Sequence, residues 1–369
     1  MKMTRVFAKL AVTAGIALLI PLPLVMSLAN AQDQPEAPAP KVRLRTPHPD
    51  SLQAINDDFN RQLLQLERGR LDRLSRLAQH QAPAEAAATY EQLFRLAIAS
   101  NLFQEAEPAA ASVVKASSPS PTTVALAHLV KIIAEADRGM YEQSLETLKQ
   151  AFETAQQAAA PSRPRATLQA GELTGICDAY YQRLVHADQF QIARQACQLA
   201  LEHTQSPVVK EFLAGRLKRL DLVGQPAPPI EGTDLDGKPF NLARLKGKVV
   251  LVEFWASWCL PSAEEVEWFQ GVAQSRHVKG FEVVGLNLDT LQDGGQKLET
   301  VLPNIRRFLL DHNVSWPNLI NSSEAHDFAR AYGVTDIPAS VLIGRDGTIV
   351  QLDLVRKNLE TVIDREIGR

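Results

Sequence analysis

The sequence carries little net charge of either sign. Lysine and arginine number 39 and aspartate and glutamate 42, which gives a formal net charge of -3 over 369 residues. Domains that bind nucleic acid gather positive charge on one face. This mildly acidic chain lacks that footprint, so we expect no nucleic-acid partner.

The sequence also lacks a metal-binding pattern. None of its eight histidines pairs with another histidine, a cysteine or an acid at a ligand spacing that we recognise. Residues 234–237, Asp-Leu-Asp-Gly, begin like a calcium loop, but the later acidic ligands do not follow. We interpret them as a hairpin turn and predict neither a metal nor a cofactor.

Cysteine is scarce, with only Cys177, Cys197 and Cys259. An odd number leaves at least one thiol free or paired with another molecule, and Cys259 is the odd one. If Cys177 and Cys197 lie on the two helices of one antiparallel hairpin, their positions bring the sulfur atoms face to face. A structural disulfide is then predicted, and two reduced, buried thiols are the alternative.

The N-terminus resembles an export signal. Three basic residues precede the apolar run 10–28, which ends in Ala-Asn-Ala at 29–31, a small-x-small cleavage signature. We predict that residues 1–31 are a signal peptide and that the protein is exported to the periplasm or another extracytoplasmic compartment. A retained membrane tether is the alternative, because about 19 apolar residues nearly span a bilayer. Two prolines inside the run favour cleavage.

Residues 32–50 are rich in proline and predict an extended linker. Strand-like runs are then scarce in residues 51–221, where alanine, leucine, glutamine and glutamate predominate with apolar residues at helical spacing. This segment is predicted to be an all-α domain.

A short pattern recurs in this helical segment. Phe103, Tyr141 and Phe190 each stand three residues before a small residue at the start of an alanine-rich stretch. The pattern resembles the second helix of a tetratricopeptide repeat, where it allows two helices to pack closely. The intervals are unequal, so a degenerate repeat array or a generic bundle both fit. The domain would provide a concave binding surface or serve as a spacer.

Residues 222–369 alternate strand and helix signals and predict an α/β domain. The expected elements are a hairpin turning at Asp236-Gly237, a strand at 248–254, a helix at 259–276, a strand at 281–287, helices at 298–312 and 323–332, two strands flanking Asp346-Gly347, and a helix from about 358.

Cys259 comes directly after the apolar strand and at the start of the next helix. Unpaired backbone N–H groups and the positive end of the helix dipole favour a thiolate at such a position. Pro261 suits a first helical turn. Ser262 stands where a second thiol would normally attack a mixed disulfide at Cys259, so the usual internal disulfide cannot form.

Several ordered motifs of this domain resemble the exported thioredoxin-like oxidoreductases of the TlpA and ResA type. The resemblance covers roughly 222–369 and rests on residues 223–228, 235–242, 247–248, 254–259 and 332–338. It implies a thioredoxin fold, a protein or small-molecule thiol or disulfide as substrate, and an external thiol as reductant. It also implies a cis-proline at Pro338 facing Cys259, with Trp258 and Ile337 beside it in the substrate site.

Two acids are further candidates for the catalytic site. Glu253 lies six residues before Cys259, where thioredoxins keep a buried acid that can carry protons to or from the sulfur. Glu265 matches an acid that ResA-type proteins place beside their cysteines. Its alternative role is that of a solvated helix residue in a run with Glu264 and Glu267.

The missing second thiol leaves three functional readings. Cys259 can act alone in thiol-disulfide exchange, with an external thiol completing the cycle. Alternatively, the fold is a redox-inactive module that holds a partner recruited by the helical domain. A peroxidase is less favoured, because Ala256 stands where peroxiredoxins need threonine.

Overall fold

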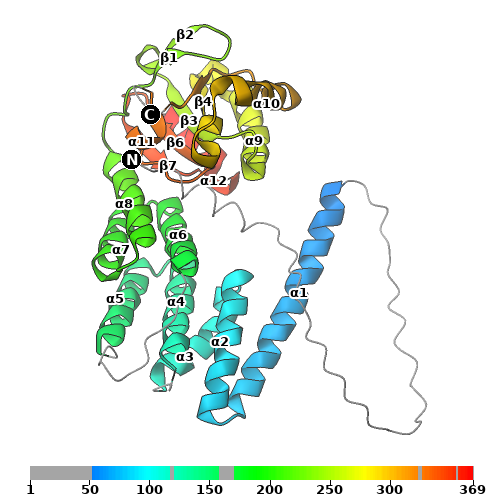
Figure 1. Cartoon of the computed structure of the whole chain (residues 1–369), viewed down its shortest axis with the longest axis vertical. Helices are drawn as coiled ribbons and strands as arrows, with labels where there is room; N and C mark the ends of the chain where they lie inside the picture. The colour runs from blue at the N-terminus through cyan, green and yellow to red at the C-terminus, as the bar shows by residue number, and fades with distance from the viewer. Residues whose placement is uncertain (1–51, 117–119, 158–169, 323–325, 355, 369) are drawn as a thin grey trace, which may run out of the picture.

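The computed structural model describes residues 52–116, 120–157, 170–322, 326–354 and 356–368. A helical region is followed by an α/β domain (Figure 1). The predicted signal peptide, 1–31, and proline-rich linker, 32–50, lie outside the described residues. Within those residues, no helix combines the length and the apolar character needed to cross a membrane.

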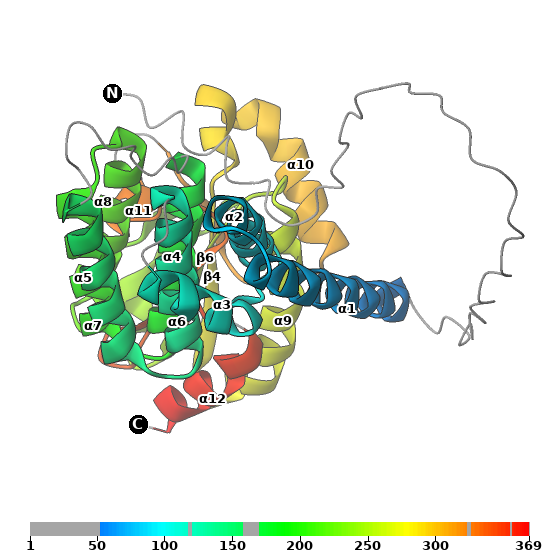
Figure 2. The ribbon, with the colours of Figure 1, turned by 90° about the horizontal axis from the view of Figure 1, so that it is seen from below.

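Eight helices make up the described part of the helical region. They are α1 (Leu52–Gln79), α2 (Pro83–Ala99), α3 (Phe103–Lys115), α4 (Pro121–Asp137), α5 (Tyr141–Gln157), α6 (Ala170–His186), α7 (Phe190–His203) and α8 (Pro207–Leu222). Helix α1 projects away from the other helices in both views (Figures 1 and 2). Helices α2 to α7 form three successive hairpins.

The three hairpins have the same turn. The first helix of each has 17 residues, and a residue of positive φ follows two positions after it: Asn101, Gly139 or Asp188. The next backbone N–H then donates to a carbonyl five residues earlier, at 2.8 to 2.9 Å. This satisfies a carbonyl that the helix end would otherwise leave without a partner.

The second helix of each hairpin begins at the aromatic residue of the recurrent pattern. These residues are Phe103, Tyr141 and Phe190. The small residue three positions later is fully buried in every case; the three are Ala106, Ala193 and Ser144. The sequence pattern therefore predicted both where these helices begin and which of their faces packs inward.

The α/β domain is built on a five-stranded sheet. Its elements are β1 (Glu231–Thr233), β2 (Pro239–Asn241), η1 (Leu242–Leu245), β3 (Val249–Trp255), α9 (Leu260–Arg276), η2 (His277–Lys279), β4 (Phe281–Asn287), η3 (Asp289–Gly294), α10 (Leu298–Asp311), β5 (Asn318–Ile320), α11 (Phe328–Ala331), β6 (Ala339–Ile343), β7 (Ile349–Leu352) and α12 (Arg356–Ile367).

The strand order in the sheet is β5-β4-β3-β6-β7, and β1 pairs with β2 in a separate hairpin. Strands β3, β4 and β5 run parallel, whereas β6 is antiparallel to both β3 and β7. A parallel β-α-β unit followed by an antiparallel hairpin and a helix is the thioredoxin arrangement. The predicted fold class is therefore confirmed.

Different layers cover the two faces of the sheet, because alternate side chains of a strand point in opposite directions. On one face, Val249 and Leu251 of β3 pack with Phe269 of α9. On the other face, Val250 and Val252 belong to a buried cluster that continues into the helical region. Leu213 and Leu220 of α8 belong to the same cluster, and α8 ends directly below the α/β domain in Figure 1.

The structure differs from the sequence-predicted elements at two places and adds one contact at the sheet edge. The helix expected at 323–332 is confined to Phe328–Ala331 within the described residues, and 323–325 lie outside them. The short strand β5 was not predicted. The proline-rich segment after α8 is tied to the sheet edge, since Gly224 N–H donates to the Ile349 carbonyl at 2.8 Å.

Candidate functional site

Cys259 is the N-cap of helix α9. Strand β3 is fully buried and ends at Trp255, and a short turn delivers Cys259 in extended backbone conformation, with φ -92° and ψ 103°. Pro261 lies in the first turn of the helix, where its missing N–H costs no hydrogen bond. Cys259 therefore begins a helix of 17 residues at the position that the sequence predicted, and its side chain makes no capping hydrogen bond to that helix.

The loop before β6 lies against this thiol. The Ile337–Pro338 peptide bond is cis, and Cys259 Sγ lies 3.8 Å from the carbonyl oxygen of Ile337, close enough for the thiol to donate to it. Trp258, Ile337 and Pro338 are all partly exposed, whereas Cys259 is only 7% exposed. The thiol is therefore less accessible than the three residues that were predicted to line its substrate site.

Ser262 is buried in the first turn of α9. Its N–H donates to the Cys259 carbonyl at 3.1 Å, and its side chain is fully shielded from solvent. The hydroxyl oxygen has no hydrogen-bond partner among the described residues. Ser262 therefore occupies the position that a second cysteine would take, with a hydroxyl in place of the thiol.

Glu253 is completely buried in the middle of the sheet. Its register partners are Gly285 of β4 and Ser340 of β6, and neither carboxyl oxygen has a hydrogen-bond partner in the described part of the chain. Burial, reinforced by the negative charge of Glu265, raises the pKa of Glu253 well above its ordinary value. Burial therefore favours the neutral form of this carboxyl over the charged form.

Glu265 differs from the acids around it. Glu264 and Glu267 are exposed, but Glu265 is half-buried. Burial raises the pKa of Glu265 to about 8, and the charges of Asp353 and Glu264 act in the same direction. The alternative reading of Glu265 as an ordinary solvated helix residue does not agree with this environment.

Asp289 supports the active-site turn, and sequence reasoning did not identify it. Its carboxylate accepts hydrogen bonds from the Ser257 N–H at 2.8 Å and from the Ser257 hydroxyl. Asn287 donates to the same carboxylate at 2.8 Å. Asp289 follows β4, whose carboxyl end lies beside that of the parallel strand β3. The sequence did contain a signal that could have identified Asp289, because a polar residue directly after a predicted strand often lies at the site-bearing edge of a parallel sheet.

The structure contains Cys177 and Cys197 as free thiols, so the disulfide predicted between them is not formed in it. Both line an apolar cavity of about 390 Å³ between α4, α5, α6 and α7. Burial raises the pKa of Cys177 to about 11 and that of Cys197 to about 12. Thiols in such surroundings stay protonated and react slowly, which corresponds to the alternative of two reduced, buried cysteines.

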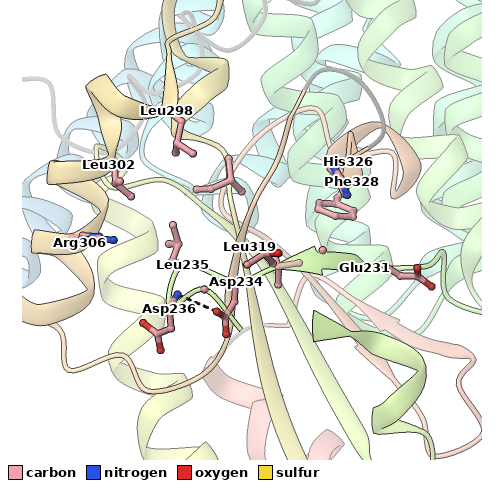
Figure 3. A pocket seen from close by; sticks show the side chains of 14 residues that line it. Glu231, Asp234, Leu235, Asp236, Leu298, Leu302, Arg306, Leu319, His326 and Phe328 are labelled. Carbon is pink, nitrogen blue, oxygen red and sulfur yellow. Dashed lines mark hydrogen bonds between the residues drawn. The ribbon is translucent and has the colours of Figure 1, made fainter. Parts of the chain in front are cut away.

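A second cavity, of about 610 Å³, lies between the β1–β2 hairpin and α10 (Figure 3). Its polar lining residues include Asp234, Arg306 and His326. Asp234 accepts a hydrogen bond from the Asp236 N–H at 3.0 Å, drawn as the dashed line, so this carboxylate serves the hairpin turn. None of the candidate catalytic residues lines this cavity. In the described ranges, no three His, Cys, Asp or Glu side chains gather as a metal site.

The C-terminal domain is similar to known proteins. The sequence profile of the AhpC/TSA family matches residues 223–352, which include Cys259 and the cis bond. The thiol-disulfide oxidoreductase ResA of Bacillus thuringiensis subsp. konkukian is 30% identical over 129 residues, which are 35% of this chain and 68% of that protein. ResA of Bacillus anthracis is 31% identical over 129 residues, with the same coverage.

A solved structure from Chlorobium tepidum, described as a thiol:disulfide interchange protein of the thioredoxin family, is 27% identical to the chain. The similarity covers 39% of this chain and 96% of that one, with a TM-score of 0.33.

Proposed function

Because this chain belongs, through its C-terminal domain, to the ResA-type family of thioredoxin-fold thiol-disulfide oxidoreductases, we propose that it performs thiol-disulfide exchange through the single thiol of Cys259. The observation that carries this proposal is the position of that thiol. It caps α9 and lies 3.8 Å from the carbonyl of Ile337, next to the cis-proline.

The exchange proceeds in three steps. The Cys259 thiolate attacks one sulfur of a substrate disulfide, so that a new S–S bond forms at Cys259 and the other substrate sulfur leaves as a thiolate and takes up a proton. An external thiolate then attacks the substrate sulfur of the mixed disulfide, so that the Cys259 thiolate leaves and that substrate sulfur becomes bonded to the external thiol. A second external thiolate attacks this new disulfide at the external sulfur, which releases the second substrate thiol. In sum, one substrate disulfide is reduced to two thiols and two external thiols are oxidised to one disulfide. Ser262 has no sulfur with which to resolve the mixed disulfide internally.

Glu253 and Glu265 are the proton-carrying groups of this proposal. Each has a pKa raised mainly by burial, and the pKa of Glu265, at about 8, allows that carboxyl to hold a proton near neutral pH. Glu265 lies in α9, the helix that Cys259 caps, and its charge acts on Glu253 in the strand that leads to the thiol. The pair can therefore store or release a proton as the charge on sulfur changes.

The substrate lies in extended conformation across the exposed edge formed by Trp258, Ile337 and Pro338. A peptide or small molecule bound there presents its disulfide to the sulfur of Cys259, because the Ile337 carbonyl lies directly beside that sulfur. The external reductant uses the same opening.

The protein acts outside the cytoplasm, after removal of residues 1–31. Residues 32–50 then form an extended segment that precedes the helical domain. Residues 51–221 form one domain and 222–369 the other. We regard helices α2 to α7 as degenerate tetratricopeptide-type repeats, since the three hairpins have the same turn and each second helix starts at an aromatic residue.

A binding module without redox turnover is the second candidate function. The observation that favours it is the buried serine at position 262 together with a thiol that is only 7% exposed. In that case the edge formed by Trp258, Ile337 and Pro338 holds a partner that the helical domain recruits. A peroxidase has less support, because Ala256, fully buried, cannot supply the hydroxyl of a threonine.

Trapping of the mixed disulfide tests the proposal. Protein isolated from its native compartment is acid-quenched, alkylated and separated without reduction, and the partner on Cys259 is identified by mass spectrometry. The matched control is Ser262→Ala, which keeps the thiol, and the negative control is Cys259→Ser. We expect disulfide-linked partners on the wild type and Ser262→Ala only. Partners that bind Cys259→Ser equally well, without a covalent bond, would support the binding module instead.

A further inference from the structure

Helix α8 of the helical region packs directly against the loop that leads to the cis-proline. A Cβ atom on Gly215 would lie 2.5 Å from Thr335 Cγ2, and one on Gly333 would lie 3.1 Å from the Gly215 carbonyl oxygen. Gly333 also has φ +66°, a conformation that favours glycine. The two segments therefore approach as closely as their backbones allow.

Arg216, the next residue of α8, joins the two parts of the molecule by charge. Its guanidinium donates to Asp178 Oδ1 of α6 at 2.6 Å and to Asp336 Oδ2 at 2.7 Å. The side chain is only 2% exposed, and it lies 4.8 Å from the ring centres of both Tyr181 and Phe212. A buried guanidinium with two carboxylates and two aromatic rings has a fixed geometry.

Arg219, one turn further along α8, makes a second connection. It is fully buried, pairs with Asp353 and donates to the Ser340 carbonyl at 3.3 Å. Ser340 in β6 lies opposite Glu253 in β3. Two arginines of one helix thus hold both ends of the segment 336–340, which contains the cis bond.

The ion pair between Arg216 and Asp336 lies one residue before the carbonyl that contacts the Cys259 sulfur. Asp336, the partner of Arg216, precedes Ile337, whose carbonyl lies 3.8 Å from Cys259 Sγ. The position of that carbonyl therefore depends on a side chain supplied by the helical region, 120 residues earlier in the sequence.

We propose that Arg216 is a positioning residue for thiol exchange at Cys259. By bridging Asp336 and Asp178, its guanidinium fixes the Ile337–Pro338 edge on which the disulfide substrate lies. The helical region is then part of the working site, neither a spacer nor solely a recruiting domain. This inference rests on the proposed exchange at Cys259.

Two rates measured on the full chain separate positioning from general support of the fold. The first is formation of the mixed disulfide between Cys259 and a peptide disulfide, which needs the Ile337–Pro338 edge. The second is alkylation of Cys259 by iodoacetamide at the same pH, which needs an accessible thiolate but no substrate held along that edge. Both are followed by mass spectrometry of the Cys259 peptide, together with the melting temperature of each variant.

Arg216→Met should slow mixed-disulfide formation by roughly tenfold or more and leave alkylation within about twofold of the wild type, because small misplacements of a reacting edge are costly. The matched control is Arg183→Met, which removes an arginine that also pairs with an aspartate, Asp137, and lies over an aromatic ring, Phe103. Arg183 makes these contacts within the helical region only, so both rates should be unchanged in that variant.

If Arg216→Met fails to fold, Asp336→Asn decides, because it keeps the shape of the side chain and removes its charge. We expect the same selective loss. Where both fold, the double variant should be no slower than Arg216→Met alone, since the two residues act as one unit. If a folded Arg216→Met or Asp336→Asn variant formed the mixed disulfide at the wild-type rate, the inference would be overturned. Absence of any exchange in the wild type would instead refute the proposed function.

Discussion

Cys197 of the helical region and Cys259 of the α/β domain are almost equally hidden but lie in different backbone surroundings, whereas Cys177 is partly exposed. Cys197 in the helical region is 5% exposed and Cys259 in the α/β domain is 7% exposed. Cys197 lies inside a helix and lines an apolar cavity, whereas Cys259 caps a helix and lies against a carbonyl of the cis-proline loop. Similar exposure therefore does not make Cys197 and Cys259 equivalent, because the backbone around the two thiols differs.

The same comparison shows what each domain contributes. The helical region surrounds its cysteines with leucine, alanine and tyrosine, and burial raises their pKa values to about 11 and about 12. The α/β domain places Cys259 at the N-cap of α9 and against the partly exposed Ile337–Pro338 edge. Strand β3 and helix α9, which flank Cys259 in the sequence, carry two acids with raised pKa values. The experiments below alter one side of this contrast at a time.

Restoring the second thiol should have the largest effect. In Ser262→Cys the new sulfur lies in the turn that Cys259 caps, so an internal disulfide should form. Reduction of a protein disulfide with a small external thiol should then become at least about tenfold faster, because the attack on the mixed disulfide becomes intramolecular.

The turnover assay uses a protein disulfide and limiting external thiol, and Ser262→Ala is the matched control. Wild type and Ser262→Ala should accumulate mixed disulfides, whereas Ser262→Cys should not. An internal disulfide in Ser262→Cys without faster turnover would indicate that the Ile337–Pro338 edge no longer serves catalysis, and the binding module would be the better function.

Oxidation of the helical-region pair would have the next largest effect. If Cys177 and Cys197 become bonded after export, they close a loop of about 20 residues and should stabilise the protein by on the order of 3 kcal/mol. Because both thiols are free in the structure, non-reducing peptide mapping should find the two cysteines in separate fragments, and reduction should leave the melting temperature unchanged. A linked fragment together with a lower melting temperature after reduction would show that the disulfide forms.

The pH dependence of stability should give a smaller effect. The pKa of Glu265 is about 8 in the folded protein against an ordinary value of 4.5. Between these values the folded protein keeps a proton that the unfolded chain releases, so the free energy of unfolding should fall as pH rises from about 5 to 8, by on the order of 2 kcal/mol.

Chemical denaturation at pH 5, 6.5 and 8 measures this fall. Glu265→Gln should remove the part due to Glu265, whereas Glu264→Gln, which changes an exposed acid on the same helix, should leave the slope unchanged. Equal slopes in wild type and Glu265→Gln would show that this carboxyl is not perturbed by the fold.

The sequence predicted most of the fold where the signals are local. Strand 281–287 matches β4 exactly in its bounds, and the aromatic pattern marks the start of three helices. Strand β5 escaped prediction because it has three residues and is held by a distant contact, from Trp255 Nε1 to Asn318 Oδ1 at 3.0 Å. Its position depends on the folded sheet more than on its own residues.

The candidate site divides in the same way. Cys259 and Ser262 are apparent from one short motif, and Pro338 from another. Asp289 was missed because it acts through a hydrogen bond to a turn 32 residues away. Arg216 was missed because its partner Asp336 is 120 residues away and no local pattern joins them. Single motifs identify reacting groups, but not the residues from other elements that hold them in place.

Residue-resolved labelling kinetics test the difference between the thiols most directly. Native protein is treated with iodoacetamide at neutral pH, and the modification of each of the three cysteines is followed by mass spectrometry. We expect Cys259 to react first and Cys177 and Cys197 to react only on unfolding, because burial raises the pKa of both helical-region thiols. Equal rates at all three cysteines would contradict the assignment of Cys259 as the exchanging thiol.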